Sequence, residues 1–284
     1  MKKSMKLLSL LLALVMVLGL AACNSSQNPG ASPTPAEGSS RYLILDNVLA
    51  EEEYGIGFRK NDELCTFVDA ALKVLKADGK LAEISNQWFG EDITTIEADA
   101  KALDELSPEP REFILGLDDS FPPMGYRDSE NNIVGFDIDV ATAVCEKLGW
   151  TLTLKPIDWN AKEMELESGN VDCLWNGMTL TDERKETFSC SAPYMKNKQI
   201  IVVMADSGIK TMDDLKGKKL VLQTGSSAEE ALDANADFKA SLGAVNTMDT
   251  NLNCFMDLEQ GSSDAVLVDS IVADWYITTG NSPE

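Results

Sequence analysis

Histidine is absent from all 284 residues of this chain. Its absence excludes the Ser-His-Asp and Cys-His arrangements, in which an imidazole activates the nucleophile. It also argues against a zinc site, because imidazole is among the commonest ligands of that metal. We therefore expect neither of these catalytic arrangements and no metal. We also expect no catalytic residues of another kind and no cofactor.

Basic side chains are scarce beside acidic ones. The chain has 24 Lys and Arg residues against 47 Asp and Glu residues, a net charge of −23. Without Lys2, Lys3 and Lys6 of the N-terminal segment, 21 basic residues remain and the net charge is −26. Such a chain is poorly suited to nucleic acid or to docking on anionic lipid through a basic patch. The charge favours a cationic or zwitterionic small ligand, although its ordinary effect is solubility.

Cysteines are few and irregularly spaced. Of the six, Cys23 belongs to the N-terminal segment, and the other five are an odd number without the spacing of a disulfide framework. Their disulfide state is left open. Cys145 and Cys173 lie in apolar surroundings, which is typical of buried thiols.

The N-terminal apolar run, Leu7 to Ala22, is short for a stable membrane span. With three lysines before it, residues 1–22 have the pattern of a secretory signal peptide. The run ends in Leu-Ala-Ala-Cys23, which resembles a bacterial lipoprotein cleavage site, where the Cys is diacylated and becomes the new N-terminus. The alternative is a Cys that happens to lie in the apolar region. Residues 23–40 are predicted to be a flexible tether, so we expect an exported lipoprotein anchored to the outer face of the cytoplasmic membrane.

The remaining chain alternates strand-like and helix-like stretches, which is typical of an α/β protein with a largely parallel sheet. Residues 93–111 are polar and end in Ser-Pro-Glu-Pro, so they are predicted to be a linker. Strands are expected over 41–45, 54–58, 113–117, 151–157, 171–175, 199–204, 220–222, 244–248 and 264–269. Helices are expected over 61–75, 81–89, 136–148, 162–168, 210–215, 228–232, 251–260 and 270–277.

The stretch VDCLWNGMTLTDER, residues 171–184, combines strand, turn and charge. A buried strand is expected to end at Asn176-Gly177, where the backbone can turn tightly. The hydroxyl of Thr179 and the guanidinium of Arg184 follow, and a guanidinium can bind a carboxylate through two hydrogen bonds. The alternative is a surface loop in which Arg184 pairs with its acidic neighbours Asp182 or Glu183.

Five stretches, one of which contains residues 171–184, carry a family resemblance: DDSFPPMGY, VGFDIDVATAVCEKLGW, GNVDCLWNGMTLTDERKETFSCSAPY, MDDLKGKKLVLQTGSSAEEAL and GSSDAVLVDS. Residues 113–284 resemble the first three-quarters of bacterial extracellular solute-binding proteins of family 3, which serve polar amino-acid ABC importers. The resemblance implies an α/β, two-lobed periplasmic-binding-protein-like (type II) fold. Two hinge strands would join the lobes, and the ligand would lie in the cleft between them.

Residues 42–90 look like the C-terminal segment of the same family, so the chain resembles a circular permutant. Permutation is tolerated where the new ends fall on exposed loops. The rival interpretation is a truncated tandem of two binding domains. The permuted order would assign 41–50 and 197–284 to lobe 2, 51–92 and 112–196 to lobe 1, 93–111 to the linker, and 50–54 and 194–198 to the hinges.

The resemblance also assigns the ends of the ligand. Arg184 and Thr179 would hold the α-carboxylate, with backbone N–H groups of Ser226 and Ser227 at a helix start. Ser227 could instead be a plain N-cap, since Ser227-x-x-Glu230 has the capping-box spacing. Asp269 would hold the α-ammonium group.

Gly177 would add a carbonyl beside the ammonium group. The alternative for Asp269 is an N-cap of the helix that follows it.

For the ligand side chain, the resemblance implies two aromatic walls, Phe121 and Trp159. Asp118 would meet the far end of the side chain, with Gln223 across the cleft from it. Asn176 would shape the pocket. An acid at position 118 without a lysine opposite favours lysine, arginine or ornithine over glutamine.

These assignments predict a monomeric binding protein that closes on a polar, and by Asp118 cationic, L-amino acid and delivers it to an ABC permease. One alternative is a dehydratase-like enzyme on the same fold, with Asp118 or Glu163 as acid or base. The others are a non-transport sensor or scaffold and a truncated tandem fragment.

Overall fold

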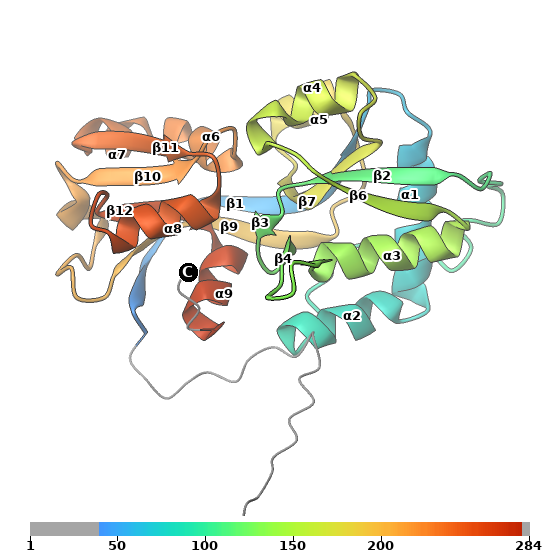
Figure 1. The fold of residues 1–284 in the computed structure, drawn as a ribbon, viewed down its shortest axis with the longest axis horizontal. Helices are drawn as coiled ribbons and strands as arrows, with labels where there is room; N and C mark the ends of the chain where they lie inside the picture. The colour runs from blue at the N-terminus through green and yellow to red at the C-terminus, as the bar shows by residue number, and fades with distance from the viewer. Residues whose placement is uncertain (1–39, 280–284) are drawn as a thin grey trace, which may run out of the picture.

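The computed structural model describes residues 40–279, so the predictions for the signal peptide, the tether and Cys23 lie outside the described residues. Figure 1 shows two halves that lie side by side and share the long strands β1 (Tyr42–Phe58) and β9 (Met195–Met204). The strands of a nine-stranded sheet run in the order β11-β10-β12-β9-β1-β7-β2-β6, with β8 beside β1. We refer to the half with β2, β6 and β7 as lobe 1, and to the half with β10, β11 and β12 as lobe 2.

Lobe 1 has parallel strands β2, β6 and β7 at its centre. A large apolar core lies under α1, α2 and α3 and continues into lobe 2, where it includes Phe255 and Val266. A smaller core, with Leu166, Leu174 and Phe188, lies by α4 and α5. Its elements are α1 (Leu64–Ala77), α2 (Lys80–Phe89), β2 (Glu112–Leu117), β3 (Ser120–Phe121), β4 (Gly125–Arg127), β5 (Ile133–Val134), α3 (Phe136–Leu148), β6 (Thr151–Pro156), η1 (Trp159–Ala161), α4 (Lys162–Glu167), β7 (Cys173–Thr179), α5 (Asp182–Thr187) and β8 (Ser189–Cys190).

Lobe 2 has β10 between β11 and β12, parallel to both, while β12 runs antiparallel to β9. Each central strand is a run of apolar residues, as expected where helices cover both faces of a sheet. Its further elements are η2 (Met212–Leu215), β10 (Lys219–Gln223), α6 (Ser227–Ala234), α7 (Ala236–Ser241), β11 (Ala244–Met248), α8 (Asn251–Glu259), β12 (Ala265–Asp269) and α9 (Ser270–Thr279).

The predicted helix over 136–148 is confirmed at both ends. A glycine ends it, and its apolar residues recur at helical spacing, so that they share one buried face. Phe136, Val140 and Val144 point into the core with almost no exposed surface. Gly149 takes a left-handed conformation (φ 70°), and its N–H donates to the carbonyl of Cys145. The strand over 244–248 is likewise confirmed.

Strand β1 is one continuous element, whereas the sequence predicts two short strands with a hinge at 50–54. It pairs with β9 from Tyr42 to Tyr54 and then continues beside β7. The acidic run remains extended because Glu51 and Glu53 face Lys198 and Lys196 across the strand pair. Strand β9 likewise begins at Met195 rather than at 199, so both predicted hinges lie inside strands.

Strand β7 does not end at Asn176-Gly177, so that prediction is wrong. Gly177 has a φ of +59°, and its N–H donates to Oδ2 of Asp137 at 2.7 Å. The chain then continues in the strand as far as Thr179, which pairs with Tyr54. The flexible dipeptide therefore makes an irregularity within the strand, because pairing with β1 resumes beyond it.

The segment 93–111 packs on lobe 1 and forms turns rather than a helix. The N–H of Thr95 donates to the carbonyl of Tyr194 at 2.8 Å, and Ile96 is buried. The predicted linker is thus a connection that is fixed to the surface of lobe 1.

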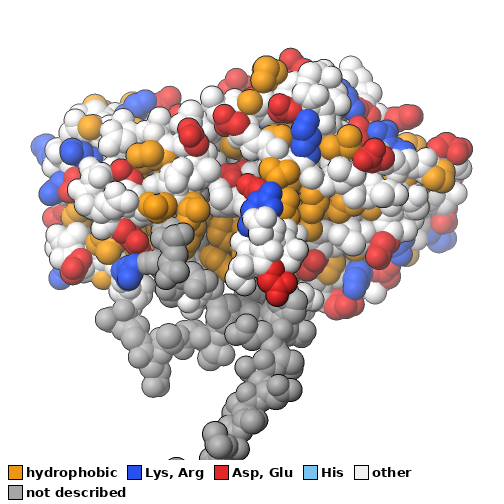
Figure 2. Space-filling model, in the orientation of Figure 1, with side chains coloured by type: hydrophobic (Ala, Val, Ile, Leu, Met, Phe, Trp, Pro, Cys, Tyr) orange, Lys and Arg blue, Asp and Glu red, His pale blue; other side chains and the backbone are white. Residues whose placement is uncertain are grey.

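Charged side chains of both signs are interspersed over the face drawn in Figure 2, with no continuous basic patch on it. Between residues 40 and 279, no helix has both the length and the hydrophobicity needed to cross a membrane. The five cysteines in that range are free thiols, and Cys145 and Cys173 are buried as predicted.

Candidate ligand-binding site between the lobes

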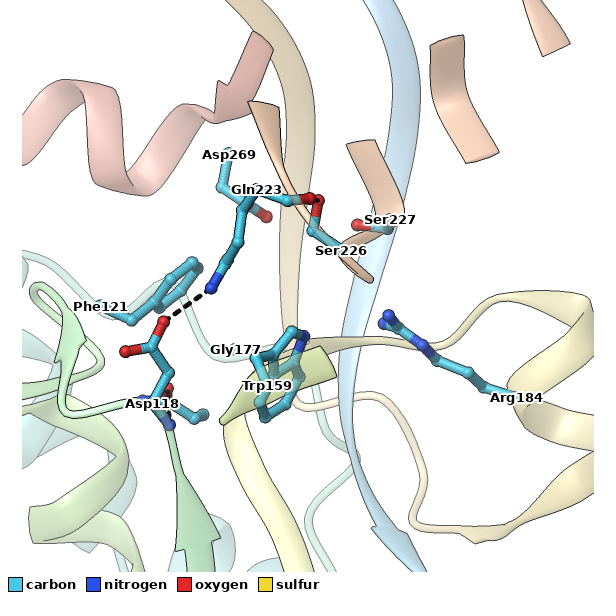
Figure 3. Close-up of a pocket in the computed structure, with 10 residues that line it drawn as sticks. Asp118, Phe121, Trp159, Gly177, Arg184, Gln223, Ser226, Ser227 and Asp269 are labelled. Atoms are coloured by element: carbon cyan, nitrogen blue, oxygen red, sulfur yellow. Dashed lines mark hydrogen bonds between the residues drawn. The ribbon is translucent and has the colours of Figure 1, made fainter. Parts of the chain in front are cut away.

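A pocket with about 300 Å³ of empty space lies where the two lobes meet. Figure 3 shows its residues converging from both lobes. Of the predicted site residues, all but Thr179 line it. They are Asp118, Phe121, Trp159, Asn176, Gly177 and Arg184 from lobe 1, and Gln223, Ser226, Ser227 and Asp269 from lobe 2.

Arg184 is held at one end of the pocket by helix α5. The side chain of Thr181 caps this helix by accepting the N–H of Arg184 at 3.3 Å. Arg184 is 6% exposed, and its guanidinium donates to two carbonyls, those of Thr179 at 3.0 Å and Gly225 at 3.3 Å. It pairs with neither of its acidic neighbours, so the surface-loop alternative is wrong.

Helix α6 begins one residue earlier than predicted, with Ser226 as its N-cap. Ser227 is therefore the first helical residue, and the capping box with Glu230 does not form. The hydroxyl of Ser227 lies 3.1 Å from that of Thr179 in lobe 1. The structure thus places Thr179 behind Ser227, in contact with the pocket residues but outside the lining.

Asp269 enters the pocket from lobe 2, where β12 ends, and is 4% exposed. Its Oδ1 accepts from the hydroxyl of Tyr54 and from Nδ2 of Asn197, both at 2.6 Å. Both partners are neutral. Burial, followed by the nearby carboxylate of Glu52, raises the pKa of Asp269 to about 7.

Asp118 and Gln223 meet directly across the pocket, as the dashed line in Figure 3 marks. Nε2 of Gln223 donates to Oδ2 of Asp118 at 2.8 Å, and Asn251 holds the other end of the same amide at 2.9 Å. Ser120 donates its N–H to Asp118 Oδ1 at 2.9 Å. Burial raises the pKa of Asp118, and a neutral amide is its partner from lobe 2.

The aromatic residues and Asn176 complete the lobe 1 side. The ring of Phe121 lies against Gly177, where an added Cβ would come within 2.7 Å of it. Oδ1 of Asn176 accepts the N–H of Asp118 at 3.1 Å and so fixes the end of β2. Trp159 is buried, and the Lys162 ammonium lies 5.6 Å from its ring centroid.

Lys162 is a residue that the sequence analysis missed. Its side chain is 5% exposed, and Nζ donates to the carbonyl of Gly225 in lobe 2 at 2.9 Å. Glu163 pairs with it at 3.0 Å from the side of a second, outer hollow of about 820 Å³. Burial and the charge of Arg184 lower the pKa of Lys162. A lysine at the start of a helix gives no local signal of burial.

The hinge strands supply further polar groups that were missed. Side chains alternate between the two faces of a strand, so every second residue of β1 and β9 faces the same side. This alternation is the sequence signal that could have indicated which residues lie next to the pocket. Those next to the pocket are Glu52 and Tyr54 on β1, and Asn197 and Gln199 on β9.

Comparison with known proteins gives consistent matches. The model of the bacterial extracellular solute-binding proteins, family 3, matches residues 113–275. Over 162 residues the chain is 34% identical to the L-cystine-binding protein TcyJ of Escherichia coli, covering 56% of this chain and 59% of that protein. It is 32% identical over 173 residues to the arginine-binding extracellular protein ArtP of Bacillus subtilis, covering 60% and 66%.

A crystal structure of an ABC uptake transporter substrate-binding protein from Streptococcus pneumoniae, with bound histidine, has a TM-score of 0.58 and 40% identity. That likeness covers 60% of this chain and 70% of the other. The chain spans about three-fifths of the length of the cystine-binding relative described above. On the match of the family model over more than half of its length, the chain belongs to the bacterial extracellular solute-binding proteins of family 3.

Proposed function

We propose that this protein binds a polar L-amino acid in the pocket between the lobes. The observation that carries the proposal is a pair of buried, opposite charges without charged partners. Arg184 makes no ion pair with any residue between 40 and 279, and Asp269 accepts only from neutral groups there. Buried unpaired charges are costly, so a ligand that carries a carboxylate and an ammonium group would satisfy both at once.

The other pocket residues support a side chain with a polar, cationic end. Phe121 and Trp159 offer apolar surface, and Asp118 supplies a negative charge beyond it. The amide of Gln223 donates to one oxygen of Asp118 at 2.8 Å. A guanidinium or ammonium group would replace or share that contact with a charge-assisted bond. The relatives above are named for cystine, arginine and histidine, which are polar amino acids.

Closure of the lobes would couple ligand binding to transport. Four hydrogen bonds join the lobes around the pocket: Asp118 with Gln223, Thr179 with Ser227, and both Lys162 and Arg184 with the carbonyl of Gly225. A ligand that bridges Arg184 and Asp269 would add bonds that only the closed arrangement makes, and so would shift the population toward it. The closed form would deliver the amino acid to an ABC permease.

The proposal includes export and lipid anchoring through Cys23, with the chain acting as a monomer. Labelling of cells with a palmitate analogue should mark the protein, and Cys23→Ser should abolish the label. A label that survives this substitution would contradict the anchor.

We also propose the permuted order, with residues 41–92 completing the fold of residues 112–279. Two observations support it. Strand β1 is central, between β9 and β7. The rings of Tyr42 and Tyr276 both pack on Phe255, so the start of β1 lies near α9.

A reordered chain tests the permutation. In it, residues 112–279 come first and 41–92 follow through a short linker. We expect cooperative unfolding and the ligand preference of the original chain. A reordered chain that fails to fold would favour the truncated tandem.

A thermal-shift screen tests amino-acid binding directly. The purified protein is melted with each of the twenty L-amino acids, ornithine and cystine. We expect a rise in Tm with one or a few polar amino acids, because a ligand that binds the native state stabilises it by mass action. Arg184→Ala should lose the rise, whereas the exposed neighbour Lys185→Ala should retain it. A folded protein that responds to none of these compounds would refute the proposal.

The dehydratase alternative gains no support from the site. Glu163 lines the outer hollow and pairs with Lys162, while Asp118 is bonded to Ser120 and Gln223. The relatives above are named as binding proteins.

A further inference from the structure

We propose that Glu52 is a positioning residue of the amino-acid site, acting through Asp269 as a second carboxylate at the end that binds the ligand's ammonium group. This inference rests on the proposed function and deepens it. It concerns a residue of the hinge strand β1, which precedes the region matched by the family model.

The carboxylate of Glu52 accepts several hydrogen bonds at the junction of the two lobes. Its Oε2 accepts from the hydroxyl of Thr179 at 3.0 Å, from Nδ2 of Asn197 at 2.7 Å and from Nε2 of Gln199 at 3.1 Å. Nε2 of Gln199 also reaches the hydroxyl of Ser227 at 3.3 Å. One carboxylate oxygen therefore orients a lobe 1 residue, two residues of β9 and, through Gln199, the start of α6.

Asn197 joins Glu52 to Asp269. Its Nδ2 donates to Oε2 of Glu52 at 2.7 Å and to Oδ1 of Asp269 at 2.6 Å, so its two N–H groups bridge the two carboxylates. This arrangement fixes the orientation of Asp269 and brings a second negative charge near it. Oε1 of Gln199 is buried and lacks a partner within residues 40–279. An ammonium group has three N–H donors, and this end of the site collects acceptors for them.

The groups around Asp269 determine how it titrates. Tyr54 and Glu52 face it from β1, the neutral amides of Asn197 and Gln199 face it from β9, and the charge of Arg184 on α5 interacts with it within the same pocket. The charge of Glu52 raises the pKa of Asp269, to which burial contributes most. The ligand's ammonium group needs the ionised carboxylate, so affinity should fall as the pH falls through about 7.

A purely structural role for Glu52 would predict a different result. In that case the side chain would only hold Thr179 and Asn197 in place, and glutamine, which keeps an acceptor oxygen, would preserve both affinity and pH dependence. Glu53 offers a matched control. It is adjacent on β1, exposed on the opposite side, and its replacement changes the net charge by the same amount.

Titration calorimetry with L-arginine, L-histidine and L-glutamine between pH 5.5 and 8.5 tests the inference. At pH 8, Glu52→Gln should weaken binding by about tenfold, since one of two charges near the ammonium group is lost. Its affinity should also fall less as the pH is lowered, because the pKa of Asp269 drops when Glu52 is neutral. Glu53→Gln should match the unmodified protein, and Glu52→Asp should retain its pH profile. An unchanged affinity and pH profile in Glu52→Gln would overturn the inference.

Melting without ligand separates this inference from the proposed function. A carboxyl group with a raised pKa in the folded state stabilises the protein as the pH falls from above 7 toward the unfolded value. Glu52→Gln should therefore melt at a higher temperature than the unmodified protein at pH 8, and this gain should shrink toward pH 5.5. Equal Tm values at every pH would contradict the coupling. If this Tm pattern appears but no amino acid binds, the coupling is supported and the proposed function fails.

Discussion

At the scale of single residues, the pocket lining combines a few buried charged side chains with two apolar aromatic ones. One basic residue, Arg184, and two acidic residues, Asp118 and Asp269, line the pocket beside Phe121 and Trp159. Each is less than a tenth exposed, so each charge acts in a medium where it is poorly screened. Single substitutions at these positions should therefore change ligand preference more than they change the fold.

Asp118→Asn should reduce the preference for cationic amino acids. The amide retains a hydrogen-bond acceptor but loses the negative charge, so affinity for L-arginine or L-lysine should fall by about tenfold or more relative to L-glutamine. Competition binding measures this ratio. Asp119→Asn is the control, because Asp119 pairs with Arg127 on the surface. An unchanged ratio in Asp118→Asn would show that another residue selects the side chain.

Lys162→Met should speed release of the ligand. The substitution removes the charged donor to the Gly225 carbonyl, a contact across the lobes. A hydrogen bond from a charged group contributes about 1.5–3 kcal/mol, so we expect the dissociation rate to rise by about tenfold. Stopped-flow displacement measures it. Lys155→Met removes a lysine whose partners, Glu165 and Asn170, are both in lobe 1, and should leave the rate unchanged.

At the scale of elements, strand β7 carries a local irregularity that shapes the pocket. Gly177 presents no Cβ to the rings of Phe121 and Tyr54, which pack against it. Its positive φ and its bond to Asp137 place the end of the strand beside the pocket. Gly177 thus determines both the course of strand β7 and the shape of the adjoining pocket wall.

Gly177→Ala should therefore destabilise the protein well beyond the cost of its backbone angle. Gly169 also has a positive φ but has open space around it, so Gly169→Ala should cost about 1–2 kcal/mol. At Gly177 the new methyl would also collide with two rings, and we expect a cost of about 3 kcal/mol or more. Urea unfolding of both variants gives the comparison. Equal losses would mean that the rings move aside.

The elements differ in how well the sequence predicts them. Helix α3 was predicted at both ends because Gly149 is a local stop signal and the apolar spacing is regular. The continuous strand β1 was not predicted, because its acidic run is favourable only beside the lysines of β9, which lie far away in the sequence. Likewise, the N-cap of α6 was placed one residue late because the Ser227 hydroxyl is used across the lobes.

The residues of the candidate site likewise differ in how well the sequence predicts them. Residues at strand ends and helix starts, such as Arg184, Ser226 and Asp269, could be assigned from family motifs before their positions were known. Glu52 and Lys162 could not, since their roles depend on the approach of two distant segments. The pairing of Asp118 with Gln223 was expected only as proximity, and its hydrogen bond depends on the relative position of the lobes.

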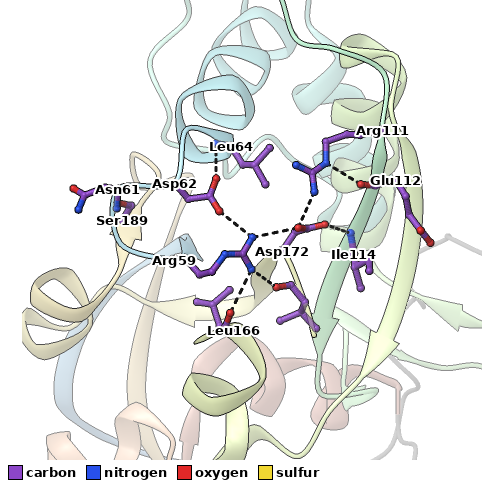
Figure 4. Close-up of polar contacts among 11 residues, drawn as sticks. Arg59, Asn61, Asp62, Leu64, Arg111, Glu112, Ile114, Leu166, Asp172 and Ser189 are labelled. Atoms are coloured by element: carbon purple, nitrogen blue, oxygen red, sulfur yellow. Dashed lines mark hydrogen bonds and ion pairs between the residues drawn. The ribbon is translucent and has the colours of Figure 1, made fainter. Parts of the chain in front are cut away.

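At the scale of the whole molecule, a polar cluster around Asp172 ties together three separate parts of the chain. Arg59 follows β1, Arg111 ends the segment 93–111, and Ile114 lies in β2 (Figure 4). Nη2 of Arg111 donates to Asp172 at 2.8 Å, Nη2 of Arg59 at 3.3 Å, and the N–H of Ile114 at 2.8 Å. The cluster therefore joins the end of β1 and the end of the segment 93–111 to the rest of lobe 1.

Asp172→Asn should weaken the whole fold. Asparagine cannot satisfy two guanidinium groups and a backbone N–H, so we expect a loss of about 2–4 kcal/mol of unfolding free energy. Asp78→Asn removes a carboxylate that is 42% exposed and paired with Lys147, and should cost less than about 1 kcal/mol. Denaturant titration monitored by circular dichroism compares the two. Similar small losses would show that the cluster contributes little.

The aromatic contacts of helix α9 have a spectroscopic consequence. Trp275 follows β12 in lobe 2, yet its ring lies 6.5 Å from Trp88 and 5.3 Å from Tyr126, both of lobe 1. Rings at this separation couple their electronic transitions, and the coupling depends on their mutual angle. Rotation of one lobe against the other should therefore alter near-ultraviolet circular dichroism and intrinsic fluorescence. The movement of the lobes can therefore be followed from the protein's own aromatic signal, without an attached dye.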